Sequence, residues 1–369
     1  MNDKVWLLHN AEYIQSDNNY FIKVNNKLYH VNLLMFNILN DIKYNKDIKG
    51  TYKLTNTEWL TIKSKIDSFL LEVLKEKDLS TSYIKNIRSI LKNKQLEQIS
   101  NIFKYLFNKS FYVLFILIVA LNFYIFFSKN IKLTLDFNFL INTIVIYPIF
   151  ILSIFIHEIG HVSACKSFNI SPKRIGIGFY FIFPVFFSDI TDIWILEKNK
   201  KIIINLGGVY FQFIFNLIIF FISSFFTGIF NSILLHIFYI NIISCLFCLI
   251  PFFRNDGYWI YSDYFDIKNL YEKSDIFFQK YIATRSLKNF SLPIILFSFS
   301  NWAYRLLVIF ILVKILLNNL NIIVFHTNTS NQELYISILW SLVSLLGVYK
   351  SFEYIFNTLI KKQKNINSF

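Results

Sequence analysis

The chain of 369 residues has only three cysteines, and their positions exclude a disulfide framework. Cys165, Cys245 and Cys248 all lie in or beside apolar runs, and the last two are predicted to be small packing residues. The sequence also predicts no signal peptide, because the first long apolar run begins only near residue 110.

Histidine and glycine are also scarce. Six histidines, only two of them close together, are too few for a membrane di-iron oxygenase, which needs many clustered histidines. His236 stands alone in an apolar run and is predicted to be structural. Seven of the nine glycines fall between Gly160 and Gly257, so we expect helix backbones to approach closely there. Gly207-Gly208 in particular can let the third span pack against the helix that carries the histidine pair.

Acidic residues number 23 against 37 Lys and Arg, which gives a net charge of +14. The placement of this charge argues against a nucleic-acid partner. Residues 1–80 are nearly balanced, with 11 basic against 10 acidic side chains, whereas residues 85–109 carry six basic side chains against Glu97 alone. A basic excess just before the first apolar run is the positive-inside signature, so we expect it to face anionic membrane lipid in the cytoplasm.

What the chain has in abundance is apolar residues, at 55%, with a mean hydropathy of +0.46. These values are typical of a membrane protein. Long apolar runs predict six spans, two of them in one run that turns near Thr227-Gly228 and one interrupted by Arg305 and Lys314; the runs are 110–128, 137–156, 202–253, 289–332 and 334–349. Cytoplasmic termini leave only Lys129 and Lys132 in external loops, which predicts a multi-pass protein of the cell (inner) membrane.

The residues before the spans predict a small soluble α+β domain over 1–80. Strands are expected at 19–24 and 27–31, separated by Asn25-Asn26, followed by a helix near 32–42. Thr55 and Glu58 form a capping box for a helix to about residue 77. Residues 82–107 repeat apolar positions at helical spacing, which predicts a basic juxtamembrane linker helix over 81–109, either interfacial or simply connecting.

Residues 150–166 (FILSIFIHEIGHVSACK) place three polar side chains in a run that otherwise resembles a membrane span. On a helix His157 and His161 share one face and can bind one metal, while Glu158 can reach a metal-bound water. Burying these groups without a function would be costly. The pattern therefore predicts a zinc site with Glu158 as the catalytic base. Cys165 lies one turn further along and points past the metal.

A zinc hydrolase site needs a third protein ligand, and Asp256 is the best candidate. It lies in PFFRNDGYW at 251–259, at the same predicted membrane side as His157, where Pro251 and Gly257 interrupt the helix and can aim the carboxylate. A solvated aspartate at a helix end is the alternative.

Residues 175–187 are too short to span a membrane. They predict a re-entrant or interfacial hairpin whose edge accepts an extended peptide, or else a buried loop wall. Asp189 and Asp192, which follow, are predicted to be loop acids.

These motifs resemble the site-2 protease family of membrane zinc metalloproteases. HEIGH at 157–161 is similar to its zinc helix and NDG at 255–257 to its aspartate motif, and the wider match over roughly 150–270 is to the bacterial peptide zinc metalloproteases. Many members have Asn-Pro where this chain has Ile250-Pro251. The resemblance implies that His157, His161 and Asp256 bind zinc and that Glu158 is the catalytic acid and base. It identifies no substrate-binding residues.

Residues 20–42 resemble the PqqD-like, winged-helix domain that binds leader peptides. The sequence as a whole predicts a mainly α-helical polytopic membrane protein with a winged-helix-like N-terminal domain over 1–80 and a zinc metalloprotease domain over 110–369. The expected partners are a peptide or membrane-protein substrate, membrane lipid and a peptide exporter. The alternative function is a non-catalytic membrane accessory protein for peptide binding or export, which would have no need of Glu158.

Overall fold

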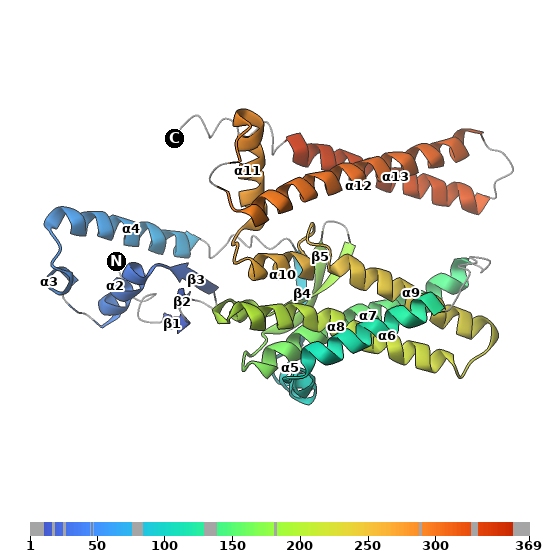
Figure 1. Ribbon diagram of the computed structural model, residues 1–369, viewed down its shortest axis with the longest axis horizontal. Helices are drawn as coiled ribbons and strands as arrows, with labels where there is room; N and C mark the ends of the chain where they lie inside the picture. Colours follow the sequence, from blue (N-terminus) through green and yellow to red (C-terminus); the bar gives the residue numbers. More distant parts are fainter. Residues whose placement is uncertain are drawn as a thin grey trace. The chain divides into compact units, whose positions relative to one another are not determined.

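The structure is a computed structural model of a mainly helical chain with two small antiparallel sheets (Figure 1). It describes residues 11–16, 19–24, 27–44, 46, 48–75, 84–128, 139–180, 183–287, 290–325 and 331–356. The chain divides into two compact units, Met1–Ile260 and Tyr261–Phe369.

The first sheet confirms the predicted N-terminal hairpin. Strands β2 (Asn19–Val24) and β3 (Lys27–Val31) pair in antiparallel register, and a further strand, β1 (Glu12–Ser16), adds to β2. Alternation along β2 buries Ile22 and Val24. They form one core with the buried face of the helix that follows.

Three helices complete this region: α2 (Leu33–Lys43), α3 (Ile48–Tyr52) and α4 (Asn56–Lys75). The predicted capping box opens α4, because the Thr55 backbone N–H donates to Glu58 Oε2 at 2.9 Å and the Glu58 N–H donates to Thr55 Oγ1 at 3.4 Å. Hydrogen bonds from the Thr55 hydroxyl, and to a lesser extent from the Thr55 backbone N–H, stabilise the Glu58 carboxylate and lower its pKa.

The predicted linker helix over 81–109 is wrong in its first half. Residues Ile84–Lys92 form strand β4, and only α5 (Asn93–Phe103) and the short 3-10 helix η1 (Lys104–Leu106) are helical. The reason lies in the irregular pairing of β4 with β5, whose register shifts between Lys85 and Arg88 and again between Ser89 and Leu91. Such bulges break the two-residue alternation of a strand, so its apolar residues recur at a spacing typical of a helix.

Strand β4 belongs to a second sheet, and two further strands of this sheet form a hairpin where one was predicted, at 175–187. The re-entrant or interfacial placement of this hairpin stays a prediction. The strand order is β4-β5-β6, with β5 at Arg174–Tyr180 and β6 at Phe183–Asp189, followed by the 3-10 helix η2 (Thr191–Ile195). The sheet packs on α7, since Leu96, Val162 and Ile175 are buried together from α5, α7 and β5.

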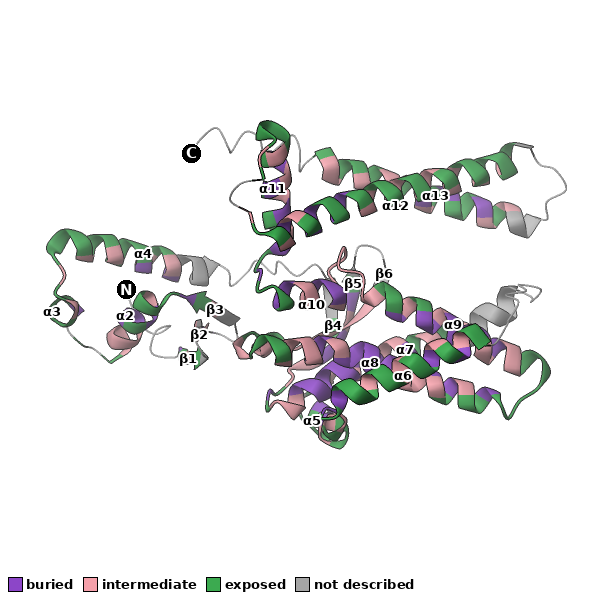
Figure 2. Ribbon diagram, viewed as in Figure 1, coloured by how far each residue is buried: buried purple, intermediate pink, exposed green. Residues whose placement is uncertain are grey.

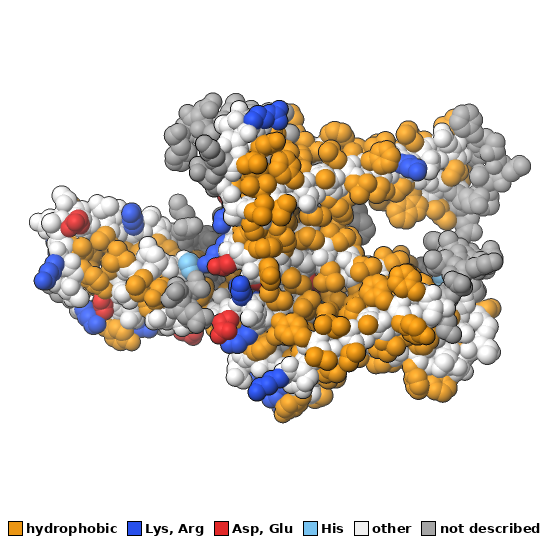
Figure 3. Space-filling view, in the orientation of Figure 1, with side chains coloured by type: hydrophobic (Ala, Val, Ile, Leu, Met, Phe, Trp, Pro, Cys, Tyr) orange, Lys and Arg blue, Asp and Glu red, His pale blue; other side chains and the backbone are white. Residues whose placement is uncertain are grey.

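Six helices are long and apolar enough to cross a membrane, as predicted, among the residues that the structure describes. They are α6 (Phe111–Ser128), α7 (Phe139–Ser167), α8 (Lys198–Ser223), α9 (Gly228–Cys248), α12 (Leu292–Phe325) and α13 (Asn331–Phe356). Hydrophobic side chains cover much of the visible face of these helices (Figure 3). The chain is therefore a polytopic membrane protein.

In the second unit, α11 (Leu270–Thr284) precedes the pair α12 and α13. Arg305, which interrupts the fifth apolar run, lies with its guanidinium carbon 3.8 Å from the centroid of the Tyr354 ring. The Tyr354 hydroxyl donates to Asp275 at 2.9 Å. An aromatic face and a nearby carboxylate thus accommodate a charge in an apolar helix.

The most buried part of the first unit lies between α7, α8 and α9 (Figure 2). Glycines bring the backbones of α7 and α8 together, as predicted: a Cβ at Gly160 would overlap the carbonyl oxygen of Gly207. Asn216 of α8 donates to Asn122 Oδ1 of α6 at 3.0 Å and to the Phe238 carbonyl oxygen of α9 at 3.1 Å. These contacts fix α6, α7 and α9 around α8.

Candidate metal centre

Helix α7 carries His157, Glu158 and His161 into the interior, where their exposed fractions are 6%, 8% and 5%. The four-residue spacing places both imidazoles on one face, and their Nε2 atoms lie 3.1 Å apart. Ligand atoms of all three residues lie within 4.8 Å of one another. The predicted cluster is therefore present as a buried group on one helix.

Helix α8 orients both rings through their other nitrogens. His161 Nδ1 lies 2.8 Å from the Ile204 carbonyl oxygen, and His157 Nδ1 lies 3.1 Å from Gln212 Oε1. An Nδ1–H that donates to these acceptors leaves the Nε2 lone pair free, which is the tautomer that a metal ligand needs. Gln212 Nε2 in turn donates to Ser244 Oγ of α9 at 3.4 Å. Sequence reasoning missed Gln212; its only signal was a polar side chain inside a 52-residue uncharged run.

Asp256 joins the histidines from the start of α10 (Asp256–Tyr264). Its Oδ2 lies 3.0 Å from His157 Nε2 and its Oδ1 lies 3.3 Å from His161 Nε2. The side chain is 14% exposed, so the alternative of a solvated helix end does not describe it. Oδ2 is buried and forms no hydrogen bond of acceptable geometry, and an orphaned carboxylate oxygen inside a protein suits a cation.

The turn before α10 explains how Asp256 reaches this place. A Cβ at Gly257 would overlap the backbone of Leu249, so the chain passes back across the end of α9 only because residue 257 is glycine. Asn255 Nδ2 donates to the Phe247 carbonyl oxygen at 2.9 Å, which ties the turn to the same helix end.

The spacing of these atoms fits a zinc ion. Tetrahedral zinc with ligands at about 2.0–2.1 Å separates the ligand atoms by roughly 3.3 Å. The observed separations are 3.1, 3.0 and 3.3 Å. Gly208 of α8 leaves the necessary room, since a Cβ there would lie 2.5 Å from Nε2 of both histidines.

A further side chain that can bind metal, Cys248, lies beside His157 and Asp256. Ligand atoms of His157, Cys248 and Asp256 all fall within 4.8 Å of one another. Cys248 also packs against the neighbouring hydrophobic core, as predicted, but its proximity to the centre was not predicted. Cys245 and Cys165 are fully buried in apolar clusters.

The other histidine and acidic residues considered in the sequence, His236, Asp189 and Asp192, lie outside the metal cluster. His236 Nδ1 donates to the Ser232 carbonyl oxygen at 2.7 Å, which agrees with a structural histidine. Asp189 pairs with Arg174, and Asp192 pairs with Lys173 and Lys23.

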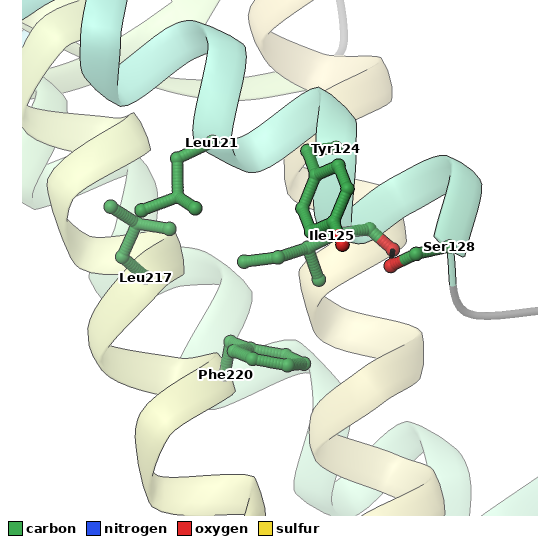
Figure 4. A pocket seen from close by; sticks show the side chains of 6 residues that line it. All are labelled: Leu121, Tyr124, Ile125, Ser128, Leu217 and Phe220. Carbon is green, nitrogen blue, oxygen red and sulfur yellow. Dashed lines mark hydrogen bonds between the residues drawn. The ribbon is translucent and has the colours of Figure 1, made fainter.

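A separate hollow at α6 and α8 contains no side chain that binds zinc (Figure 4). It is lined by Leu121, Tyr124, Ile125, Ser128, Leu217 and Phe220. Two of these, Leu121 and Tyr124, are 47% and 71% exposed, so the hollow opens on the apolar outer surface of the helices. Among the described residues, the side chains that can bind zinc therefore gather in the buried centre and not in this hollow.

The fold and the site together define a class: a polytopic membrane protein with a buried centre of two histidines and two carboxylates. No protein-family model and no solved structure matches the chain. It is 29% identical over 186 residues to the "Putative peptide zinc metalloprotease protein YydH" of Bacillus subtilis (strain 168), a match that covers 49% of this chain and 73% of that protein. This similarity supports a metalloprotease family for the chain.

Gly208 provides a test of the geometry. We expect Gly208→Ala to weaken zinc binding by roughly tenfold or more, the scale seen when the surroundings of a metal site are disturbed. The added methyl group would occupy the space that both Nε2 atoms face. Zinc affinity of the purified protein is the measurement. Gly347→Ala is the control, because that methyl would meet only the flexible Leu312 side chain. A folded Gly208→Ala protein with wild-type zinc affinity would contradict the assignment.

Proposed function

We propose that this chain is a membrane-embedded zinc metallopeptidase of the site-2 protease type, which cleaves a peptide bond in a ribosomally made precursor peptide during its maturation or export. The observation that supports this proposal best is the convergence of His157, His161 and Asp256 beside Glu158. The similarity to a protein named as a peptide zinc metalloprotease points the same way.

The roles of the side chains follow from their chemistry. His157 Nε2, His161 Nε2 and an Asp256 oxygen would hold the ion. Zinc, when bound, supplies Lewis acidity toward the scissile carbonyl and lowers the pKa of an attacking water. Glu158 accepts the proton of that water and returns it to the departing amine. Because Glu158 is only 8% exposed, its carboxylate acts away from bulk water.

The competing function is a non-catalytic peptide-binding or export partner in which zinc is structural. Structural zinc sites are closed by four protein ligands, whereas catalytic sites keep one position for water. Three side chains, His157, His161 and Asp256, converge here, and Cys248 lies close enough to be a fourth ligand. The feature that separates the two functions is therefore Glu158, a carboxylate that a structural site would not need. This arrangement favours the enzyme.

The substrate is proposed to bind as an added strand at β6. This strand lies at one edge of its sheet among the described residues. It runs beside the metal-bearing helix, since the rings of Phe155 and Phe186 lie 5.7 Å apart. Phe155 lies three residues before Glu158 on the same side of α7, so a peptide paired with β6 would lie on the Glu158 side of the helix with its backbone extended.

The N-terminal region is proposed to be a PqqD-like domain that recruits the precursor. Among the strands that the structure describes, β3 forms one edge of its sheet, which an extended peptide can join. Lys23 of β2 donates to Asp192 of η2 at 3.1 Å, and η2 follows β6 directly. A peptide held by this domain would therefore be concentrated near the proposed cleavage strand.

The proposed location is the cell (inner) membrane with both termini cytoplasmic and the basic segment before α6 at anionic lipid. A peptide exporter is a proposed partner because the proposed substrate is a precursor peptide that is matured or exported. Single cysteines in a variant without native thiols test the orientation. Ser224→Cys, between α8 and α9, should react with an impermeant reagent outside intact cells, whereas Asn108→Cys should not. The reverse labelling pattern would invert the topology.

Replacement of the base separates chemistry from metal binding. Glu158→Gln should retain about one zinc per chain and lose proteolysis by at least about a hundredfold, because the amide cannot accept the proton. Zinc content by mass spectrometry and cleavage of a precursor peptide are measured on the same preparation. Full cleavage activity in Glu158→Gln would remove Glu158 from the mechanism.

Recruitment by the front domain predicts a difference between long and short substrates. Deletion of residues 1–80 should raise KM for a full precursor severalfold, while cleavage of a saturating short peptide that spans only the cut site continues. Steady-state kinetics with both substrates provide the comparison. Equal losses on the long and the short substrate would show that the domain merely supports the fold.

A further inference from the structure

The structure places one thiol next to the metal-binding atoms, and the proposed mechanism does not use it. Cys248 is the last residue of α9, and its sulfur lies within 4.8 Å of ligand atoms of both His157 and Asp256. Its counterpart one turn earlier, Cys245, is fully buried in the apolar core. Of the chain's three cysteines, Cys248 alone is less than fully buried.

A sulfur at this place has a chemical consequence. Zinc accepts cysteine thiolate as readily as imidazole, at about 2.3 Å, and four protein ligands make a closed site that has no position for water. The Oδ2 atom of Asp256 is buried 3.0 Å from His157 Nε2 and forms no hydrogen bond of acceptable geometry, so this corner of the site suits a cation. A fourth ligand here would change an open site into a closed one.

We propose that Cys248 is an exchangeable fourth ligand that closes the zinc site in the absence of substrate. This inference rests on the proposed function. As the Cys248 sulfur binds, the thiol loses its proton to solvent and the water at that position leaves. When a peptide enters, the thiolate takes up a proton and dissociates, and water returns. No electrons are transferred in either direction.

The position of Cys248 allows this exchange. It ends α9, and the segment from Leu249 to Asn255 turns back to bring Asp256 to the histidines. Its side chain is only partly buried, unlike the two histidines. The thiol can therefore leave the zinc position by a change of its own side-chain rotamer, without movement of the helix end, while His157 and His161 are fixed by their hydrogen bonds to α8.

X-ray absorption at the zinc edge tests the inference on the full-length, zinc-loaded protein. We expect one sulfur neighbour at about 2.3 Å in the wild type, lost in Cys248→Ala and retained in Cys245→Ala and Cys165→Ala. Addition of an uncleaved peptide to the Glu158→Gln protein should remove the same sulfur signal. Cys248→Ala should also raise the initial cleavage rate severalfold at low substrate, because the water position is then always open.

The outcomes are distinguishable. Stoichiometric zinc with only nitrogen and oxygen neighbours in the wild type would overturn the inference and leave the proposed function intact. Two results together would show that Cys248 is a permanent zinc ligand: a sulfur signal that persists when the peptide is bound, and slower cleavage by Cys248→Ala. They would overturn the proposal that Cys248 exchanges with water. Absence of bound zinc would overturn both this inference and the proposed function.

Discussion

The close approach of α7 and α8 is the constraint on which the rest of the site depends. Gly160 and Gly207 let the two backbones touch, and Gly208 leaves empty the point that both imidazole Nε2 atoms face. The same contact brings the Ile204 carbonyl oxygen and Gln212 Oε1 to the far sides of the rings. The crossing of α7 and α8 thus sets the distance between the two helices, the tautomer of both histidines and the free space in front of their Nε2 atoms.

The sequence predicted the parts that depend on local pattern. The structure confirms three such local predictions: the shared helix face of the two histidines, the capping box at Thr55 and the apolar helices. Each depends on residues that are close together in the sequence. Asp256 was found from the interruptions at Pro251 and Gly257 and from resemblance to a known motif. Its distance to the histidines depends on a turn of eight residues, Leu249 to Asp256, that no periodicity describes.

What the sequence did not predict depends on contacts between distant segments. Strand β4 was assigned to a helix because its bulges give it helical spacing, and only its pairing with β5, more than 80 residues later, makes it a strand. Gln212 and Cys248 had no pattern that set them apart from other small or polar residues in apolar helices. Their importance appears only once α8 and α9 are packed beside α7.

The central claim is that Asp256 completes a zinc site with His157 and His161, and zinc affinity of a matched pair of variants tests it most directly. Asp256→Asn and Asp266→Asn each replace one carboxylate by an amide. Asp266 is exposed and has a left-handed backbone that asparagine also adopts. The account predicts a loss of roughly tenfold or more in zinc affinity for Asp256→Asn, a scale typical of disturbed metal sites, and wild-type affinity for Asp266→Asn. Wild-type zinc affinity in a folded Asp256→Asn protein would contradict it.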